Sequence, residues 1–141
     1  MPRTGSCRCG NIKLEFLEDG NNDGIVCYCK TCRNLHSSES LNLKTTVDNV
    51  KVTKGTPKIY KDQKTDSGNA ILRNFCGDCG SAVFSDPDAM PGTRFLKVGV
   101  LDDPSAIKLV GEIYVDDALN FQVRDKKLGQ KHFEGMMAKE V

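Results

Sequence analysis

The sequence predicts a mainly β fold of short antiparallel sheets with little helix. Short segments in which apolar and polar residues alternate recur about every 8–12 residues, which is the spacing of an antiparallel β protein. Clusters of Gly, Pro, Asn and Asp separate these segments and predict turns. The chain has 141 residues, so a single domain over residues 1–141 is expected. Hydrophobic residues make up 38% and Trp is absent, which predicts a small core.

The alternating segments give the expected strands in chain order. In the first, Ile12, Leu14 and Phe16 share one face, so we expect that face to be buried. The full set of expected strands is 11–17, 25–28, 41–47, 50–53, 58–61, 70–75, 81–85, 95–101 and 107–115. Residues 30–37 predict one short helical turn. Residues 62–69 and 87–92 are expected to be loops, and the tail beyond Asp125 to pack loosely.

The charge balance excludes some classes of function. Lys and Arg number 20 and Asp and Glu 19, so the formal net charge is +1. No basic excess is present to bind nucleic acid through its phosphates. No apolar run approaches the ~20 residues that span a membrane. The opening residues carry no apolar signal segment, so we expect a soluble, cytoplasmic protein.

Seven cysteines fall into three tight groups. The groups have the patterns Cys-x-Cys, Cys-x-Cys-x-x-Cys and Cys-x-x-Cys. An odd number leaves one thiol over in any scheme of disulfides, and cytoplasmic thiols stay reduced. Short spacing allows thiolates from one turn to converge on one ion, and tetrahedral sulfur ligation is typical of zinc. The cysteines therefore predict bound zinc, two ions per chain when fully loaded.

The first expected zinc site is closed and structural. Cys76 and Cys79 form a zinc knuckle, and the glycines that follow each of them permit the tight turn. Such a turn supplies only two ligands. Cys7 and Cys9 are the natural second pair. The metal would tie the N-terminal segment to the middle of the chain and compensate for the small core.

The second expected zinc site is open. Cys27, Cys29 and Cys32 can hold one ion from a single turn, and zinc with three protein ligands keeps a position for water or substrate. That pattern is typical of a catalytic site. The alternative is a closed structural site that His36 completes, four residues after Cys32. His132 is expected to be an exposed side chain of the tail.

Four segments together resemble a known family. They are Gly5-Ser6-Cys7-Arg8-Cys9-Gly10, Cys27-Tyr28-Cys29-Lys30-Thr31-Cys32-Arg33, Phe75-Cys76-Gly77-Asp78-Cys79-Gly80-Ser81 and Val98-Gly99-Val100-Leu101-Asp102-Asp103-Pro104. The chain resembles the glutathione-dependent formaldehyde-activating enzymes, a family that includes the centromere protein V domain. The resemblance is strongest over residues 5–115.

The resemblance implies the Mss4-like fold, a compact arrangement of antiparallel β-sheets with zinc knuckles. It implies a structural zinc on Cys7, Cys9, Cys76 and Cys79. It also implies a second zinc near Cys27, Cys29 and Cys32, where glutathione acts. Formaldehyde-adding members join formaldehyde to glutathione as S-hydroxymethylglutathione, which formally makes them carbon–sulfur lyases. The expected partner is therefore a small molecule, with glutathione as co-substrate.

Candidate substrate contacts follow from the charge of glutathione. Because this tripeptide is anionic, cations are expected near the second zinc, and Lys30, Arg33, Arg73 and Arg94 are the candidates. Tyr28 is either a proton donor to a bound oxyanion or a packed aromatic residue.

Two further functions stay open. Tyr28 stands where histidine is frequent in the family, and the family's C-terminal Trp is absent. A related zinc enzyme of small-molecule biosynthesis, catalysing elimination, dehydration or isomerisation of a carbonyl substrate, is the first alternative. A non-enzymatic zinc-binding interaction module is the second.

Overall fold

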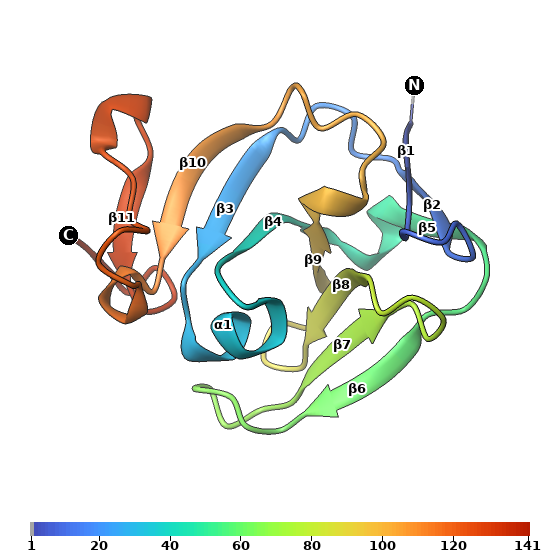
Figure 1. Ribbon diagram of the computed structural model, residues 1–141, viewed down its shortest axis with the longest axis horizontal. Helices are drawn as coiled ribbons and strands as arrows, with labels where there is room; N and C mark the ends of the chain where they lie inside the picture. Colours follow the sequence, from blue (N-terminus) through green and yellow to red (C-terminus); the bar gives the residue numbers. More distant parts are fainter. Residues whose placement is uncertain (1) are drawn as a thin grey trace. The chain divides into compact units, whose positions relative to one another are not determined.

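The computed structural model describes residues 2–141 and confirms a mainly β fold, in which one short α-helix is present among these residues (Figure 1). The chain divides into two compact units. Unit 1 comprises the chain up to Asn21 together with Leu43–Ala106, and unit 2 comprises Asn22–Asn42 and Ile107–Val141. The boundary falls inside strand β4 (Ser40–Thr46).

Unit 1 contains two sets of antiparallel strands. The first has the order β1-β2-β5, and in the second β6, β7, β8 and β9 pair in succession. The strands of unit 1 are β1 (Arg3–Ser6), β2 (Lys13–Phe16), β5 (Val50–Lys54), β6 (Lys58–Asp62), β7 (Ile71–Phe75), β8 (Ala82–Pro87) and β9 (Thr93–Lys97). Two 3₁₀ turns complete it, η1 (Val47–Asn49) and η2 (Val98–Val100).

Alternation along β2 produces the buried face that the sequence predicts. Leu14 and Phe16 are buried, whereas Lys13, the first residue of β2, is exposed. Apolar residues from the other strands, turns and loops of unit 1 complete the core, namely Ile12, Leu43, Val50, Val83, Leu96, Val98, Val100 and Leu101. The strand expected over residues 95–101 ends earlier than predicted. β9 ends at Lys97, and residues 98–100 turn into η2.

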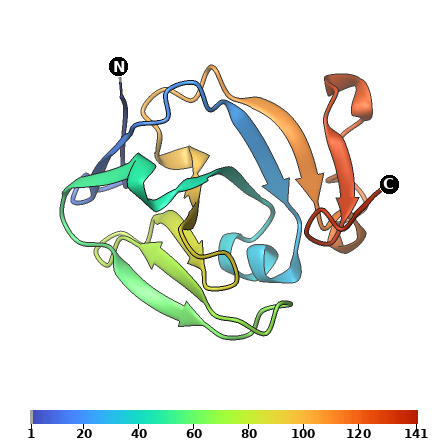
Figure 2. The ribbon, with the colours of Figure 1, turned by 180° about the vertical axis from the view of Figure 1, so that it is seen from behind.

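Unit 2 contains the helix and four strands. They are β3 (Asp23–Cys27), α1 (Lys30–His36), β10 (Lys108–Ile113), β11 (Lys131–Glu134) and β12 (Lys139–Glu140), with 3₁₀ turns η3 (Val115–Asp117) and η4 (Lys126–Leu128). β3 and β10 run side by side in both ribbon views (Figures 1 and 2).

Two pairings in unit 2 are parallel, whereas the sequence predicts antiparallel sheets. β10 pairs in parallel with β3 and with β11, whereas β11 pairs with β12 in the antiparallel direction. Parallel strands require a crossover of a dozen or more residues. The chain meets this requirement because all of Leu43–Ala106 lies between β3 and β10, and residues 114–130 lie between β10 and β11.

The tail beyond Asp125 contains elements that the sequence analysis did not expect. It forms η4, β11 and β12, and Gln130 is only 3% exposed, although most of the other residues of the tail are exposed. These strands were missed because a strand of four residues or fewer leaves too short a pattern to recognise in the sequence.

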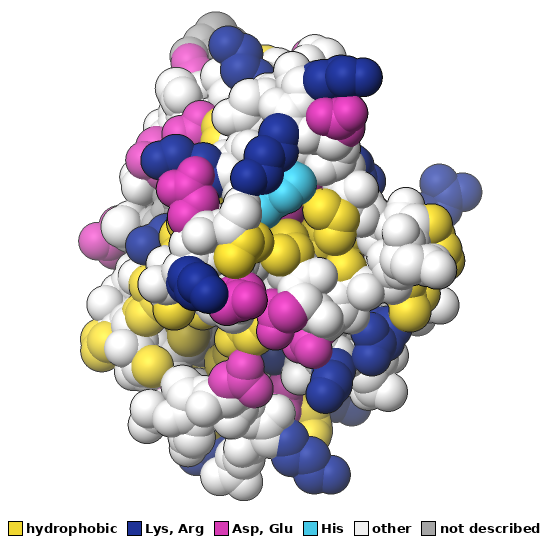
Figure 3. Space-filling view, turned by 90° about the vertical axis from the view of Figure 1, so that its left-hand side faces the viewer, with side chains coloured by type: hydrophobic (Ala, Val, Ile, Leu, Met, Phe, Trp, Pro, Cys, Tyr) yellow, Lys and Arg dark blue, Asp and Glu magenta, His cyan; other side chains and the backbone are white. Residues whose placement is uncertain are grey.

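None of the helices among the described residues is long and apolar enough to cross a membrane. The side of the molecule in Figure 3 carries Lys and Arg side chains interspersed with Asp and Glu side chains. This mixture agrees with the near-neutral composition.

Candidate functional site

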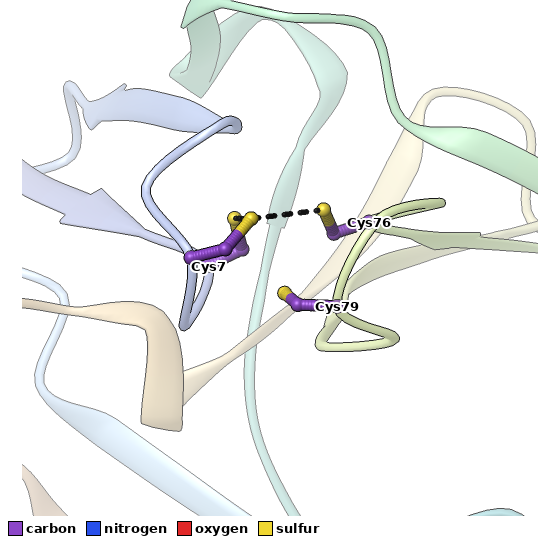
Figure 4. A group of neighbouring side chains, drawn as sticks. Cys7, Cys76 and Cys79 are labelled. Carbon is purple, nitrogen blue, oxygen red and sulfur yellow. Dashed lines mark hydrogen bonds between the residues drawn. The ribbon is translucent and has the colours of Figure 1, made fainter.

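Four cysteines from two turns of unit 1 form the first candidate metal centre. Cys7 and Cys9 follow β1, and Cys76 and Cys79 lie in the turn between β7 and β8. Figure 4 shows Cys7 on one side of the site with Cys76 and Cys79 on the other. All four sulfur atoms lie within 4.8 Å of one another, with 3.6 Å between Cys7 and Cys9 and 3.8 Å between Cys9 and Cys76. Tetrahedral zinc with bonds of about 2.3 Å requires sulfur–sulfur separations of about 3.8 Å, so the group fits zinc.

Two glycines shape the turns that carry these cysteines. Gly80 has a φ of 78°, a left-handed conformation that glycine adopts without strain, and its N–H donates to the Cys76 carbonyl at 2.8 Å. Gly5 lies so close to Val100 that a Cβ atom at this position would meet the Val100 carbonyl oxygen at 2.5 Å. A side chain at position 5 would therefore push apart the segment that leads into the first turn.

Hydrogen-bond donors surround the sulfurs of this centre. The Ile12 N–H donates to the Cys7 sulfur at 3.2 Å. The Ser81 hydroxyl lies 3.2 Å from the Cys79 sulfur. The hydrogen bond from this hydroxyl, followed by that from the Ser81 N–H, lowers the pKa of Cys79 to about 5. These donors favour thiolates, the form in which cysteine binds zinc.

The second candidate metal centre lies where β3 meets α1 in unit 2. Cys27 ends β3, Cys29 is the N-cap of α1, and Cys32 lies in the first turn of that helix. The three sulfur atoms lie within 4.8 Å of one another. Among the described residues, His36 is not part of this group of donor atoms. The centre thus offers three sulfurs, the donor number that leaves a fourth position open on zinc.

The three thiols of this centre are crowded together. Cys27 and Cys32 are buried and Cys29 is half-buried. Hydrogen bonds from the Cys27 thiol to the sulfurs of Cys29 and Cys32, reinforced by burial, raise the pKa of Cys27 far above its ordinary value, which favours the protonated thiol in the absence of a cation. A positive ion between the sulfurs would stabilise the thiolates, and the three sulfur donors could hold zinc.

Two donors support the sulfurs of the second centre. The Cys32 N–H donates to the Cys29 sulfur at 3.2 Å, which is the N-cap interaction of α1. The Ser40 hydroxyl lies 3.1 Å from the Cys32 sulfur and is itself the acceptor of a 3.0 Å hydrogen bond from the Asn42 amide. Ser40 can accept from Asn42 and at the same time donate its proton to a Cys32 thiolate. These bonds reduce the charge on two of the three sulfurs.

Tyr28 lies on the opposite face of the β3–β10 sheet from the cysteines that flank it. Successive side chains of a strand point to opposite faces. Tyr28 is 1% exposed, and its hydroxyl donates to Glu112. Burial, followed by this hydrogen bond to a carboxylate, raises the pKa of Tyr28 above its ordinary value. Of the two roles that the sequence leaves open, the buried contacts favour the packed aromatic residue, and the role of proton donor stays a prediction.

The four predicted substrate-binding cations lie in different surroundings. Lys30 is exposed at the first position of α1, and Arg33 donates to the Asp117 carbonyl at 2.9 Å, so both accompany the cysteines of unit 2. Arg73 and Arg94 belong to unit 1.

Both unit 1 arginines are already paired with carboxylates. Arg73 forms an ion pair with Asp62 at 3.0 Å, and Arg94 forms one with Asp86 at 2.7 Å. Arg94 also stacks on the Phe84 ring at 3.6 Å. These contacts give both arginines a structural role within unit 1.

The structure also places side chains near the second centre that the sequence analysis missed. Ser40 carries no motif, because it follows Cys32 by eight residues and opens a strand. Glu112 did have a signal, since it is a single carboxylate within the apolar end of β10. His132 was expected to be exposed, but its side chain is only 12% exposed and lies 2.7 Å from Glu112, because β11 pairs with β10.

Comparisons with known proteins agree with this arrangement. A crystal structure of a Rhodobacter sphaeroides protein is similar, with a TM-score of 0.58 and 19% identity over 92% of this chain and 98% of that chain. At this identity the likeness concerns the fold, and it is consistent with the Mss4-like fold. No curated protein matches the sequence significantly. Residues 2–117 match the family of the glutathione-dependent formaldehyde-activating enzyme. Because this match covers most of the chain and includes all seven cysteines, the chain belongs to the glutathione-dependent formaldehyde-activating enzyme family.

Proposed function

We propose that the chain is a zinc-dependent enzyme that acts on an adduct of glutathione, with chemistry of the carbon–sulfur lyase type. The observation that carries the proposal is the second centre, where Cys27, Cys29 and Cys32 converge without a fourth donor of the His, Cys, Asp or Glu type in the group among the described residues. Family membership supports glutathione as the thiol. The cytoplasm, where glutathione is abundant and thiols stay reduced, is the expected location.

The reaction itself is simple in its bonds. The sulfur of glutathione forms a bond to the carbonyl carbon, the carbonyl π bond breaks, and the thiol proton passes to the oxygen. Cleavage is the reverse. A zinc ion at the second centre would supply stabilisation of the thiolate form of glutathione, whose ordinary pKa is near that of cysteine, about 8.5.

The protein contributes binding and orientation. We assign Lys30 and Arg33 to the carboxylates of glutathione, because both lie on α1 close in sequence to Cys29 and Cys32. Holding the thiol and the aldehyde together replaces an encounter of two molecules by a reaction within one complex. Three thiolates already neutralise the charge of a zinc ion, so positioning is the main contribution expected.

A direct assay tests this function. Formation of S-hydroxymethylglutathione from formaldehyde and glutathione also occurs without a catalyst, so the exchange rate should be measured by carbon-13 NMR with and without the zinc-loaded protein. We expect acceleration by the unaltered protein and none by Cys29→Ser, which lacks one ligand of the second centre. Equal rates with the two proteins would contradict the proposal.

The same assay with larger aldehydes defines the substrate. Acceleration confined to a larger carbonyl compound would retain the glutathione adduct chemistry and replace formaldehyde. Acceleration that does not depend on glutathione would instead favour the related zinc enzyme acting on a carbonyl substrate alone.

A further inference from the structure

Glu112 is the most deeply buried charged side chain of unit 2 among the described residues, with an exposed fraction of 0%. It belongs to β10, in the strand pair that holds Cys27. A buried carboxylate is retained only where hydrogen bonds replace its lost water. The partners of Glu112 therefore show what it holds in place.

The register of the strands puts these partners on one face of the sheet. Glu112 pairs with Val26 of β3 and with His132 of β11. Paired residues lie on the same face of a sheet, and Tyr28 follows Val26 by two positions, so it shares that face. The opposite face carries Cys27 and Ile113, which pack with Cys29, Cys32 and Phe133.

Hydrogen bonds reach both oxygens of the carboxylate, and His132 lies close to one of them. The Tyr28 hydroxyl donates to one oxygen of Glu112, and the Arg124 N–H donates to the same oxygen at 3.3 Å. The Gln130 amide donates to the other oxygen at 3.1 Å, and His132 Nε2 lies 2.7 Å from it. Burial acts to raise the pKa of Glu112, but the hydrogen bonds from Tyr28 and Gln130 outweigh it and the pKa is lowered.

Arg124 extends this hydrogen-bond network from Tyr28 to Glu39. Its guanidinium donates to the Tyr28 hydroxyl at 2.8 Å and to Glu39 at 3.0 Å. The Gln122 carbonyl lies 3.0 Å from the same hydroxyl. Tyr28 therefore contacts the chain between residues 122 and 124 on one side and Glu112 on the other.

Tyr28 connects this network to the metal centre through its own backbone. It is the residue between Cys27 and Cys29, and its N–H donates to the Ile113 carbonyl at 3.1 Å. The ring, the hydroxyl and the N–H are thus all fixed. Any rotation of this residue would change the separation of the two sulfurs that flank it.

We propose that Glu112 is a positioning residue of the second metal centre. Through Tyr28, Glu112 fixes the peptide that carries Cys27 and Cys29. Glu112 also contacts Gln130, His132 and Arg124, so the C-terminal segment supports the same centre. This inference rests on metal binding at the second centre, as the proposed function does. It adds a role for residues 122–132, all of which lie beyond the stretch that matches the family. It also explains why Tyr28 points away from the sulfurs.

The test compares metal affinities of the two centres within one protein. Glu112→Gln and Tyr28→Phe are loaded with cobalt(II), whose thiolate absorption reports ligand geometry, and the metal is removed by a competing chelator. We expect the affinity of the second centre to fall about tenfold or more, as for other residues that orient metal ligands, and its absorption spectrum to change. The four-sulfur centre of unit 1 should keep its affinity.

Asp62→Asn is the matched control. Asp62 is also a buried carboxylate, 4% exposed and bound to Arg73, but it belongs to unit 1. It should lower thermal stability without changing the affinity or spectrum of the second centre. The double variant Tyr28→Phe/Glu112→Gln should lose no more affinity than the single variant with the larger loss, because both changes break the same connection.

The outcomes separate this inference from the proposed function. An unaltered second centre in Glu112→Gln and Tyr28→Phe, with the unaltered protein binding two ions, overturns the positioning role and leaves the enzyme proposal intact. A parent protein that binds no metal at Cys27, Cys29 and Cys32 overturns both. If Glu112→Gln does not fold, Tyr28→Phe alone decides, because it removes one hydroxyl and keeps the ring.

Discussion

The two units arrange the cysteines that could hold a metal ion in different ways. In unit 1 the sulfurs come from two turns, and Cys9 and Cys76 are separated by 67 residues in the chain. In unit 2 the sulfurs of Cys27, Cys29 and Cys32 come from a single strand-to-helix corner. An ion in unit 1 therefore joins distant parts of the chain, whereas an ion in unit 2 binds to a corner that the backbone already forms.

The cysteines of the two centres also differ in solvent exposure and in the protein contacts that support them. Cys9 and Cys79 of unit 1 are exposed, so few protein contacts replace the ion if it is lost. The corner of unit 2 has buried support from the N-cap of α1 and from the contact between Tyr28 and Glu112. The comparison teaches that the two cysteine groups differ in the number of possible ligands and in the span of chain that they join, which is the basis for proposing a structural role for one and a chemical role for the other.

Loss of the unit 1 ion should have the largest effect. Cys76→Ser removes one ligand of the four-sulfur centre, and on the order of 10 kcal/mol of metal-binding free energy is coupled to folding at such sites. We expect unit 1 to lose its amide protection and the protein to bind one zinc ion at most. Elemental analysis and hydrogen exchange resolved by segment measure both. Retention of amide protection in β7 and β8 would contradict the structural role.

Loss of the unit 2 ion should abolish activity while the fold persists. Cys29→Ser removes a ligand from a corner whose backbone bonds do not depend on the metal. We expect one zinc ion per chain, a melting temperature within a few degrees of the parent protein, and no acceleration of adduct exchange. If Cys29→Ser and Cys76→Ser melt alike and each loses both ions, the division between the two centres is wrong.

A matched pair of serine variants sharpens the comparison. Ser40→Ala removes the hydroxyl beside the buried Cys32, and Ser81→Ala removes the one beside the exposed Cys79. We expect the affinity for zinc to fall about tenfold in Ser40→Ala and less in Ser81→Ala, because water replaces the lost donor only at the exposed sulfur. Chelator competition measures both affinities, and equal losses would refute the difference in solvation.

The smallest expected effect is the loss of the stability that Glu39 contributes as the pH is lowered. A hydrogen bond from the Ser38 hydroxyl, with Arg124 as a further partner, lowers the pKa of Glu39 from 4.5 to about 2. The folded-state pKa is depressed, so the stabilisation is present above about pH 4.5 and is lost as the pH falls towards 2. Glu39→Gln should be less stable by about 1 kcal/mol at neutral pH, and the difference should shrink at pH 3. Denaturant unfolding at the two pH values tests this, and a constant difference would contradict it.

The local elements of the fold were predictable from the sequence because they depend on short patterns. Alternation placed Leu14 and Phe16 on the buried face of β2, and residues 30–37 correctly predicted α1. The group of Cys27, Cys29 and Cys32 was predictable because close spacing in one turn brings sulfurs together wherever the turn lies. For the four-cysteine group, close spacing predicts each pair, and the two pairs were joined because one turn supplies only two ligands.

The features that the sequence could not predict depend on distant pairing. The parallel pairing of β10 with β3 and β11 brings Glu112 to His132, and neither partner carries a pattern that points to the other. Ser40 reaches Cys32 only because β4 begins beside the corner of unit 2. The ion pair between Arg94 and Asp86 also could not be predicted, because it forms only when β8 and β9 pair side by side.

The most direct test of the division between the two centres is the number of sulfurs that bind zinc, measured by X-ray absorption with and without glutathione. Four ligands in unit 1 and three in unit 2 predict an average of about 3.5 sulfurs per zinc in the protein with both centres loaded. Added glutathione should raise this average to about 4, because its thiolate takes the open position. An average of 3.5 sulfurs that glutathione leaves unchanged, with a nitrogen ligand that disappears in His36→Ala, would show a closed second centre and contradict the enzymatic role.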